Sequence, residues 1–268
     1  MGGVCGRYAA SRNPDDLVEE FEVERVEVRE RLEPDYNVAP TKPVYAILTR
    51  RSLELPEGSP AVRQLRVVSW GLVPSWAKDP SIGSRLINAR METLAEKPAF
   101  RRAFAKRRCL LPADGYYEWY AGAGSAVGST GKGGKAAKKQ PFYIHPKDGS
   151  SLAMAGLYEF WRAEHADPDD PSSWRWSAAV ITTEAEDAVG QIHDRMPLMV
   201  ERDRWVEWLD PARSEPDELR ELLVPAAPGR LDAHPVSTAV NNVRNNGPEL
   251  VEPLAAEGAD RTDEETLF

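Results

Sequence analysis

The sequence predicts an α+β fold, a single domain with a mostly antiparallel sheet. Short runs rich in β-branched and aromatic residues recur along the chain between clusters of turn residues, which is typical of strands. The few stretches with helical periodicity are not interleaved regularly with these runs, as they would be in a parallel α/β sheet. A length of 268 residues is sufficient for one sizeable core.

The first elements expected along the chain are a short helix and two strands. Asn13 and Pro14 precede an apolar stretch, which predicts a helix with Asn13 as its N-cap and Pro14 in its first turn. Strands are expected at 44–49 and 65–70, where β-branched residues are frequent. A long loop that contains Trp76 should follow.

The second half of the chain predicts two further helices and a run of strands. Phe100 and Phe104 are four residues apart with basic residues on the other faces, a pattern typical of an amphipathic helix. Helical periodicity returns at 202–209. Strands are expected at 109–111, 116–120, 142–145, 152–157 and 176–182.

Two segments should lie outside the core. Residues 121–140 are rich in Gly, Ala, Ser and Lys, which predicts a flexible insertion. From Glu249 to the end, seven acidic residues accompany a single arginine, so residues 254–268 are expected to form a disordered acidic tail. The folded domain is therefore expected to span residues 1–253.

The charge distribution constrains the partners. A net charge of −9 argues against indiscriminate binding to duplex nucleic acid. Between Arg85 and Arg108, however, eight basic residues accompany two acidic ones. This excess fits either a solvated helix face or a local groove that follows a phosphate backbone.

The chain has two cysteines and four histidines, and this content limits which compartment and which cofactors are expected. Because no secretory or membrane-spanning run is present, we expect a protein of a reducing compartment, the cytoplasm by default. Cys109 lies in an apolar run and should be buried. The sequence has no Cys-x-x-Cys pair and no dinucleotide or phosphate-loop fingerprint, so neither a metal site nor a cofactor is expected. No coiled-coil pattern is present, and a monomer is expected.

Cys5 gives the strongest functional signal. If Cys5 becomes the first residue of the mature chain, its α-amine and its thiol lie on adjacent carbons. The pKa of an α-amine is near ~8, so part of it is unprotonated at neutral pH and can form a Schiff base with an aldehyde. The thiol can then close this adduct into a thiazolidine ring. The alternative is a cysteine that merely packs, since free cysteines are often buried.

Five ordered motifs, together with the Cys-Gly-Arg-Tyr opening at 5–8, resemble the SOS response-associated peptidase family, whose members are also described as abasic-site processing proteins. The resemblance extends from Cys5 to about Pro253. It implies a curved, barrel-like sheet with peripheral helices, and single-stranded DNA containing abasic sites as the partner. The motifs lie at 36–40, 70–76, 87–93, 108–119 and 193–197.

One departure from the family concerns the start of the chain. The family pattern places the cysteine directly after the initiator methionine, whereas Gly2, Gly3 and Val4 intervene here. Either this leader is cleaved or translation begins at Val4, since a valine codon can serve as a start.

Aldehyde capture needs proton transfer, and Glu118 and His193 are the candidates. Both lie among aromatic or apolar neighbours, which can exclude water and shift a pKa toward neutrality. A structural glutamate held by an arginine is the alternative for Glu118. The resemblance implies that Glu118 acts as general acid and base, and that His193 shuttles a proton at the sugar hydroxyl.

Polar residues near these motifs are candidates for orienting the nucleophile and holding phosphates. Asn88 and Arg90 are two residues apart, so on an extended segment they project to the same side. The resemblance implies that Asn88 orients Cys5 and that Arg90 binds a phosphate through its planar fork. Arg7 is expected to hold another phosphate. A surface ion pair of little energetic consequence is the alternative for each arginine.

Flat apolar side chains are expected to stack on bases. Such stacking contributes ~1 to 3 kcal/mol per base and tolerates any sequence, which suits a protein that recognises a missing base. Core packing is the alternative and is expected for at least half of the tryptophans. The candidates for stacking are Pro40, Trp70, Trp76 and Trp119.

These patterns predict an abasic-site processing enzyme of the DNA damage response. It should bind single-stranded DNA and form a thiazolidine crosslink through Cys5 by lyase-like Schiff-base chemistry, with a peptidase activity that removes its own leader. Two other classes stay open. N-terminal-nucleophile amidotransferases also begin with Cys-Gly, although Asn246-Gly247 lies in no matching context for their oxyanion element. The third class is a noncatalytic binding module.

We expect the natural protein to begin at Cys5. N-terminal sequencing of the protein isolated from its own host checks this. Recovery of an intact Met1 would contradict it, because a blocked terminus cannot form the ring.

Overall fold

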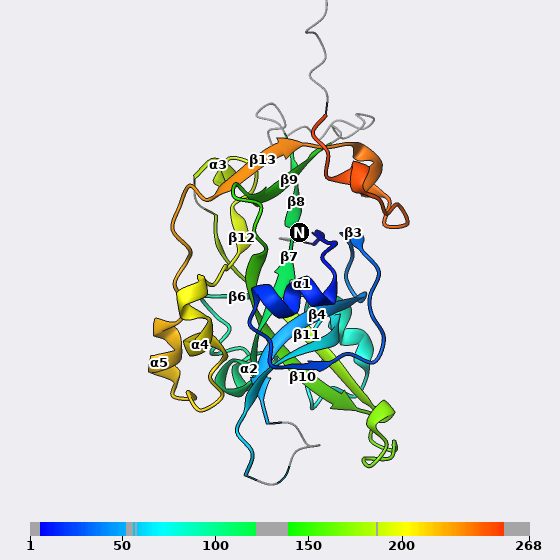
Figure 1. Cartoon of the computed structure of the whole chain (residues 1–268), viewed down its shortest axis with the longest axis vertical. Coiled ribbons are helices and arrows are strands. Elements are labelled where there is room, and N and C mark those ends of the chain that lie inside the picture. Colours follow the sequence, from blue (N-terminus) through cyan, green and yellow to red (C-terminus); the bar gives the residue numbers. More distant parts are fainter. Residues whose placement is uncertain (1–5, 52–55, 57, 122–138, 186, 255–268) are drawn as a thin grey trace, which may run out of the picture.

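The computed structural model describes residues 6–51, 56, 58–121, 139–185 and 187–254 (Figure 1). Its strands form a barrel and a smaller sheet, which lie one beyond the other along the long axis of the molecule. The predicted α+β class and the barrel-like sheet are confirmed. Within the described residues, no helix has the length and apolar character that crossing a membrane requires.

The barrel is mostly antiparallel and is closed by one short parallel contact. The pairs β5 to β4, β4 to β7, β7 to β10 and β10 to β11 are antiparallel. Ser177 and Ala178 of β11 then pair in parallel with Ser69 and Trp70 of β5, which closes the ring. The barrel strands are β4 (Pro43–Arg50), β5 (Val62–Trp70), β7 (Arg108–Ala113), β10 (Leu152–Arg162) and β11 (Trp174–Glu184).

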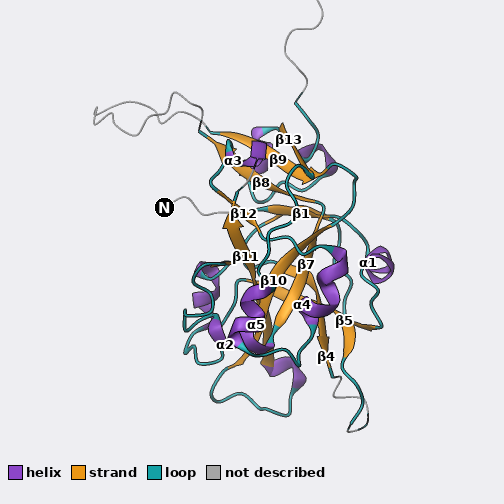
Figure 2. Ribbon diagram, turned by 90° about the vertical axis from the view of Figure 1, so that its left-hand side faces the viewer, coloured by secondary structure: helices purple, strands orange, loops and turns teal. Residues whose placement is uncertain are grey.

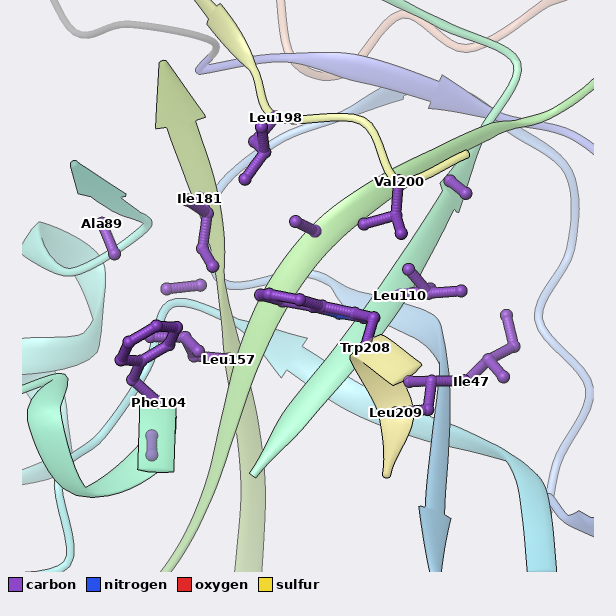
Figure 3. Packing of buried hydrophobic residues seen from close by; sticks show 14 of the residues in the cluster. Ile47, Ala89, Phe104, Leu110, Leu157, Ile181, Leu198, Val200, Trp208 and Leu209 are labelled. Carbon is purple, nitrogen blue, oxygen red and sulfur yellow. The ribbon is translucent and has the colours of Figure 1, made fainter. Parts of the chain in front are cut away.

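Side-chain alternation along these strands creates two cores. On β4, Ala46 and Leu48 belong to a cluster inside the barrel, whereas Ile47 belongs to a cluster on its outer face. Helices cover the outer cluster, and Trp208 lies across it near Leu110 (Figure 3). The covering helices are α1 (Pro14–Glu20), α2 (Arg101–Lys106), α4 (Trp205–Leu209) and α5 (Pro216–Glu221), whereas Val189 of α3 (Asp187–Gly190) packs in the inner cluster.

Helix α1 confirms the predicted helix near the start of the chain, with Asn13 as its N-cap and Pro14 in its first turn. The Asn13 side chain accepts hydrogen bonds from the backbone N–H groups of Asp15 and Asp16, at 2.9 and 3.0 Å, and so caps α1. Helices α2, α4 and α5 gather on one side of the barrel (Figure 2). Short 3-10 helices occupy Pro80–Arg85, Pro171–Ser173, Arg202–Arg204, Thr238–Asn241 and Pro248–Leu250.

A second sheet covers one end of the barrel. Strand β7 passes into β8 through the single residue Asp114. Gly115 follows, where an added Cβ would lie 2.5 Å from the Tyr143 ring and 2.6 Å from the Ile144 carbonyl, so only glycine fits this sharp passage. The sheet has the order β13 (Leu231–Pro235), β9 (Gln140–Pro146), β8 (Gly115–Tyr120), β1 (Tyr8–Ala10) and β3 (Asp35–Val38).

Three short strands extend the barrel wall. Strand β2 (Arg25–Glu27) pairs in parallel with β5. Strand β6 (Asn88–Arg90) pairs in parallel with β11, and β12 (Arg195–Pro197) pairs with β11 in the antiparallel sense. Thr182 of β11 pairs with residues of both β6 and β12, so this strand holds the two site motifs in register.

The insertion and the tail stay predictions. Residues 122–138 and 255–268, most of the two segments expected to lie outside the core, are not among the described residues.

Arg108 joins the helices to the barrel from a buried position. Its guanidinium donates to the carbonyls of Trp208 at 2.8 Å, Phe104 at 2.9 Å and Asp210 at 2.6 Å. Burial lowers the pKa of this guanidinium to about 10, still well above neutrality. Arg108 therefore donates hydrogen bonds to carbonyls at the C-terminal ends of α2 and α4, and so connects the two helices to β7.

Replacing Arg108 should destabilise the fold. We expect Arg108→Met to lower the free energy of unfolding by about 3 kcal/mol, because buried carbonyls lose their donors. Arg101→Met, on the exposed face of α2, should change it by about 0.5 kcal/mol or less. Urea unfolding measures both, and equal losses in the two variants would contradict the assignment.

Candidate active site

The pairing of β1 with β8 brings the start of the described chain to Glu118. Tyr8 pairs with Tyr116, and the N–H of Tyr117 donates to the carbonyl of Arg7 at 2.9 Å. Continuing this antiparallel register by one residue places Gly6 opposite Glu118. Cys5, the predicted nucleophile, lies outside the described residues. In the sequence it directly precedes Gly6.

Tyr8 fixes this strand against the barrel. Its side chain is fully buried, and its ring meets the ring of Trp70 edge-on at 4.9 Å and 62°. The Trp70 indole N–H donates to the carbonyl of Ile87 at 3.0 Å. Asn88 is the next residue, so β1, the Trp70 motif and β6 form one packed unit.

Glu118 and His193 lie together at this end of the barrel. The Glu118 side chain is 3% exposed, and its Oε2 is 4.0 Å from Nε2 of His193. Two groups at this separation can both reach hydrogen-bond distance of an atom placed between them. This pair therefore suits proton transfer to a small substrate group.

Backbone contacts set the orientation of His193. The N–H of Arg195 donates to Nδ1 of His193 at 3.0 Å, which makes Nδ1 the acceptor and leaves the proton of the neutral ring on Nε2. Asp194 Oδ1 is also 2.9 Å from Nδ1, and this contact requires the opposite tautomer. The Asp194 side chain is 88% exposed and free to rotate. The backbone contact is fixed by β12 and therefore decides the tautomer.

Arg195 links the two site motifs. Its guanidinium is bidentate to Glu92, at 2.6 and 3.0 Å, and donates to the Thr182 carbonyl at 2.7 Å. The hydrogen bonds from Arg195 lower the pKa of the Glu92 carboxyl. This ion pair connects the residues after β6 to the start of β12, and so fixes the position of Asn88 relative to His193. The sequence did not predict this ion pair, although Glu92 lies in the motif at 87–93 and Arg195 in the motif at 193–197.

The two predicted residues of β6 lie on one face, as their spacing indicated. Asn88 pairs with Val180 and Arg90 with Thr182. Asn88 is half-buried and Arg90 is exposed. The Arg90 guanidinium makes no hydrogen bond to any other residue in the described part of the chain. Arg90 thus lies in solvent at the end of the strand that carries Asn88.

Arg7 and Trp119 lie on the face of the sheet opposite to Glu118. Tyr116 packs in the cluster inside the barrel, and Tyr117 and Trp119 pack in a separate cluster with the C-terminal segment. The Arg7 guanidinium donates to Asn37 Oδ1 at 2.6 Å and lies 5.7 Å from the Trp119 ring centroid. Burial lowers the pKa of Arg7. Contacts of Arg7 and Trp119 with DNA stay predictions.

The flat side chains differ in exposure. Trp70 is fully buried under Tyr8, so it has no free face for a base, and the prediction that it stacks on DNA is wrong. Trp76 is 59% exposed. Pro40 is half-buried. Trp76 and Pro40 therefore stay candidates for stacking.

The basic stretch supplies fewer free charges than its composition indicates. Arg107 forms an ion pair with the buried Glu159 at 2.8 Å, and Arg108 is enclosed by carbonyls. Other members, including Arg90, Arg101 and Arg102, are exposed. Among the described residues, no group of three or more potential metal ligands comes together.

The fold and the site define a small barrel protein in which a carboxylate and an imidazole, those of Glu118 and His193, lie beside the start of the first strand, β1. Residues 4–243 match the family of the SOS response associated peptidase (SRAP). The chain belongs to this family, as its motifs suggested.

Relatives agree with this assignment, and a solved structure shares the fold. The chain is 36% identical over 249 residues to abasic site processing protein YoaM of Bacillus subtilis (strain 168), covering 93% of this chain and 98% of the relative. It is 32% identical over 260 residues to abasic site processing protein YedK of Escherichia coli (strain K12), covering 94% and 100%. A crystal structure of a protein from Bacteroides thetaiotaomicron superposes with a TM-score of 0.71 at 24% identity, covering 94% of this chain and 100% of that chain.

Asn246, the candidate for an oxyanion element in the amidotransferase alternative, has a structural role instead. The Asn246 side chain accepts from the N–H of Tyr36 at 2.8 Å and donates to the carbonyl of Pro34 at 3.0 Å. Asn246 is thus a structural link between two segments.

We expect neutral His193 to carry its proton on Nε2. Side-chain ¹⁵N NMR distinguishes the two tautomers. Because the Arg195 N–H fixes Nδ1 as the acceptor, Asp194→Asn should leave the tautomer unchanged. A proton on Nδ1 that shifts to Nε2 in Asp194→Asn would contradict this geometry.

Proposed function

We propose that this protein processes abasic sites by capturing them covalently in single-stranded DNA through Cys5. One observation carries the proposal: the β1–β8 register brings Gly6, the residue that follows Cys5, opposite Glu118, with His193 at 4.0 Å from Glu118. A thiol and an α-amine delivered to this pair have the proton-transfer groups that aldehyde capture needs. The names of the curated relatives, abasic site processing proteins, support the choice of substrate.

The reaction is a condensation that releases one water. The deoxyribose ring at the abasic site opens to its aldehyde. The α-amine of Cys5 adds to the aldehyde carbon, and loss of water from the carbinolamine gives a Schiff base. The thiol then adds to the same carbon, its proton passes to the nitrogen, and the thiazolidine ring closes.

Each site residue has a task in this scheme. The Glu118 carboxyl exchanges protons with the amine and with the departing hydroxyl, which its burial favours by excluding water. The Nε2–H of His193 faces Glu118 and donates to the sugar oxygen during ring opening. Asn88, on the adjoining strand β6, orients the aminothiol through its carboxamide.

The strand itself is held by groups that carry no sequence preference. Arg90 is exposed beside the site and binds a phosphate next to the lesion. Trp76, with 59% of its surface exposed, stacks on a neighbouring base. Removal of residues 1–4 by the same nucleophile is the accompanying peptidase activity, and it liberates the amine that the capture requires.

Covalent capture is tested with the N-terminally processed protein and an abasic single-stranded oligonucleotide on a denaturing gel. Cys5→Ala should abolish the heat-stable complex. Glu118→Gln should slow its formation by about 100-fold or more, since it removes general acid–base catalysis.

The chain offers a matched thiol control in Cys109. This residue is fully buried inside the barrel, and burial raises the pKa of its thiol. Cys109→Ala should therefore crosslink at the rate of the unmodified protein. Loss of the complex in Cys109→Ala but not in Cys5→Ala would refute the proposal.

A further inference from the structure

A cavity opens where two barrel strands separate. Strands β5 and β11 pair only at Ser69 with Ser177 and at Trp70 with Ala178 within the described residues. Toward the start of β11 they diverge, and a cavity of about 1280 Å³ lies between them. Trp176 lines this cavity, whereas Thr182, six residues further along β11, pairs with the site strands β6 and β12. The two regions are thus about 20 Å apart along the strand.

Arginines stacked on aromatic rings form one wall of the cavity. The Arg50 guanidinium lies 5.1 Å from the Trp176 ring centroid and 5.6 Å from that of Phe160. The Arg66 guanidinium lies 4.5 Å from the Trp176 ring, which also stacks with Tyr158 at 5.8 Å and 11°. Arg66 also donates to Gln64 Oε1 at 2.9 Å, so its guanidinium is engaged. A guanidinium that packs over aromatic rings, as that of Arg50 does, has a fixed position from which its N–H groups can bind an anion.

Arg50 is the cation of this wall that carries the argument. It lies half-buried at the end of β4. Its guanidinium donates to no acceptor and pairs with no carboxylate in the part of the chain that the structure describes. A half-buried cation that pairs with no anion among the described residues, and that lies over two rings, is a preorganised anion-binding group.

The charge of the cavity is positive in a chain whose net charge is −9. Three acidic residues also line it. Glu27 is engaged by Arg25 at 2.5 Å and by Arg66 at 3.6 Å, while Glu30 and Asp169 are exposed. The arginines of the lining are Arg25, Arg29, Arg50, Arg51, Arg66 and Arg175.

We propose that this cavity is a second contact for the phosphodiester backbone of single-stranded nucleic acid. Guanidinium edges match phosphate oxygens. The volume exceeds the range of about 300–1,000 Å³ typical of small-molecule pockets, which favours a chain segment over one small anion. The choice of a nucleic-acid strand rests on the proposed function, whereas the anion preference follows from the arginines alone. This contact lies away from the abasic site. It adds affinity for the phosphates of the strand, independently of the base sequence.

The salt dependence of binding tests this contact. Oligonucleotides without an abasic site are used, one of about 20 nucleotides and one of about 4, the lower end of the site sizes of such proteins. Each phosphate contact with a single strand contributes about 0.7 to the slope of log affinity against log salt. We expect Arg50→Gln to reduce the slope by about 0.7 on the long strand and to leave the short strand unchanged.

Two further variants keep the test decisive. Arg175 lines the same cavity but is exposed, so Arg175→Gln preserves the stacked wall if Arg50→Gln disturbs folding, and it should also lower the slope on the long strand. Arg220→Gln removes an exposed charge on α5, outside the cavity, and should leave the slope unchanged.

The possible outcomes separate this proposal from the proposed function. Equal slopes on the long strand in the wild type, Arg50→Gln and Arg175→Gln would overturn the second contact. The yield of crosslink to an abasic oligonucleotide of about 4 nucleotides should be the same in the wild type and Arg50→Gln. If the wild type forms no crosslink, the proposed function fails while the slope comparison remains valid.

Discussion

The pairing of β1 with β8 is the constraint on which the site depends. Three residues of β1 are enough to fix it, because Tyr8 is fully buried against Trp70 and the backbone bonds set the register with Tyr116. The register leads the chain to Glu118, and side-chain alternation directs Glu118 toward the barrel while Arg7 faces away. A slip by one residue would exchange these faces.

Strand β11 organises the rest of the molecule. Its middle closes the barrel against β5, and its end holds β6 and β12 in register. The bidentate contact between Arg195 and Glu92 locks these two short strands together. Because neither short strand could hold its position alone, the placement of Asn88 and His193 is a property of the whole barrel.

The sequence predicted the longer elements of the fold and the family to which the chain belongs. Asn13 caps α1 as expected, and the expected strands are present within the longer strands of the structure. The three-residue strands β1, β6 and β12 were not predicted, since so few residues carry no periodicity and only long-range pairing defines them. Trp70 was misjudged because composition does not distinguish a buried tryptophan from an exposed one. Likewise, Arg108 is counted with the basic stretch although it is enclosed by carbonyls.

The central claim is that the terminus delivered by β1 is the group that reacts. The most direct measurement is peptide mapping by mass spectrometry of the complex between the processed protein and an abasic oligonucleotide. We expect the sugar adduct on the peptide Cys5-Gly6-Arg7, with the mass of a condensation product that has lost one water. An adduct on a lysine or on the peptide that contains Cys109 would contradict it.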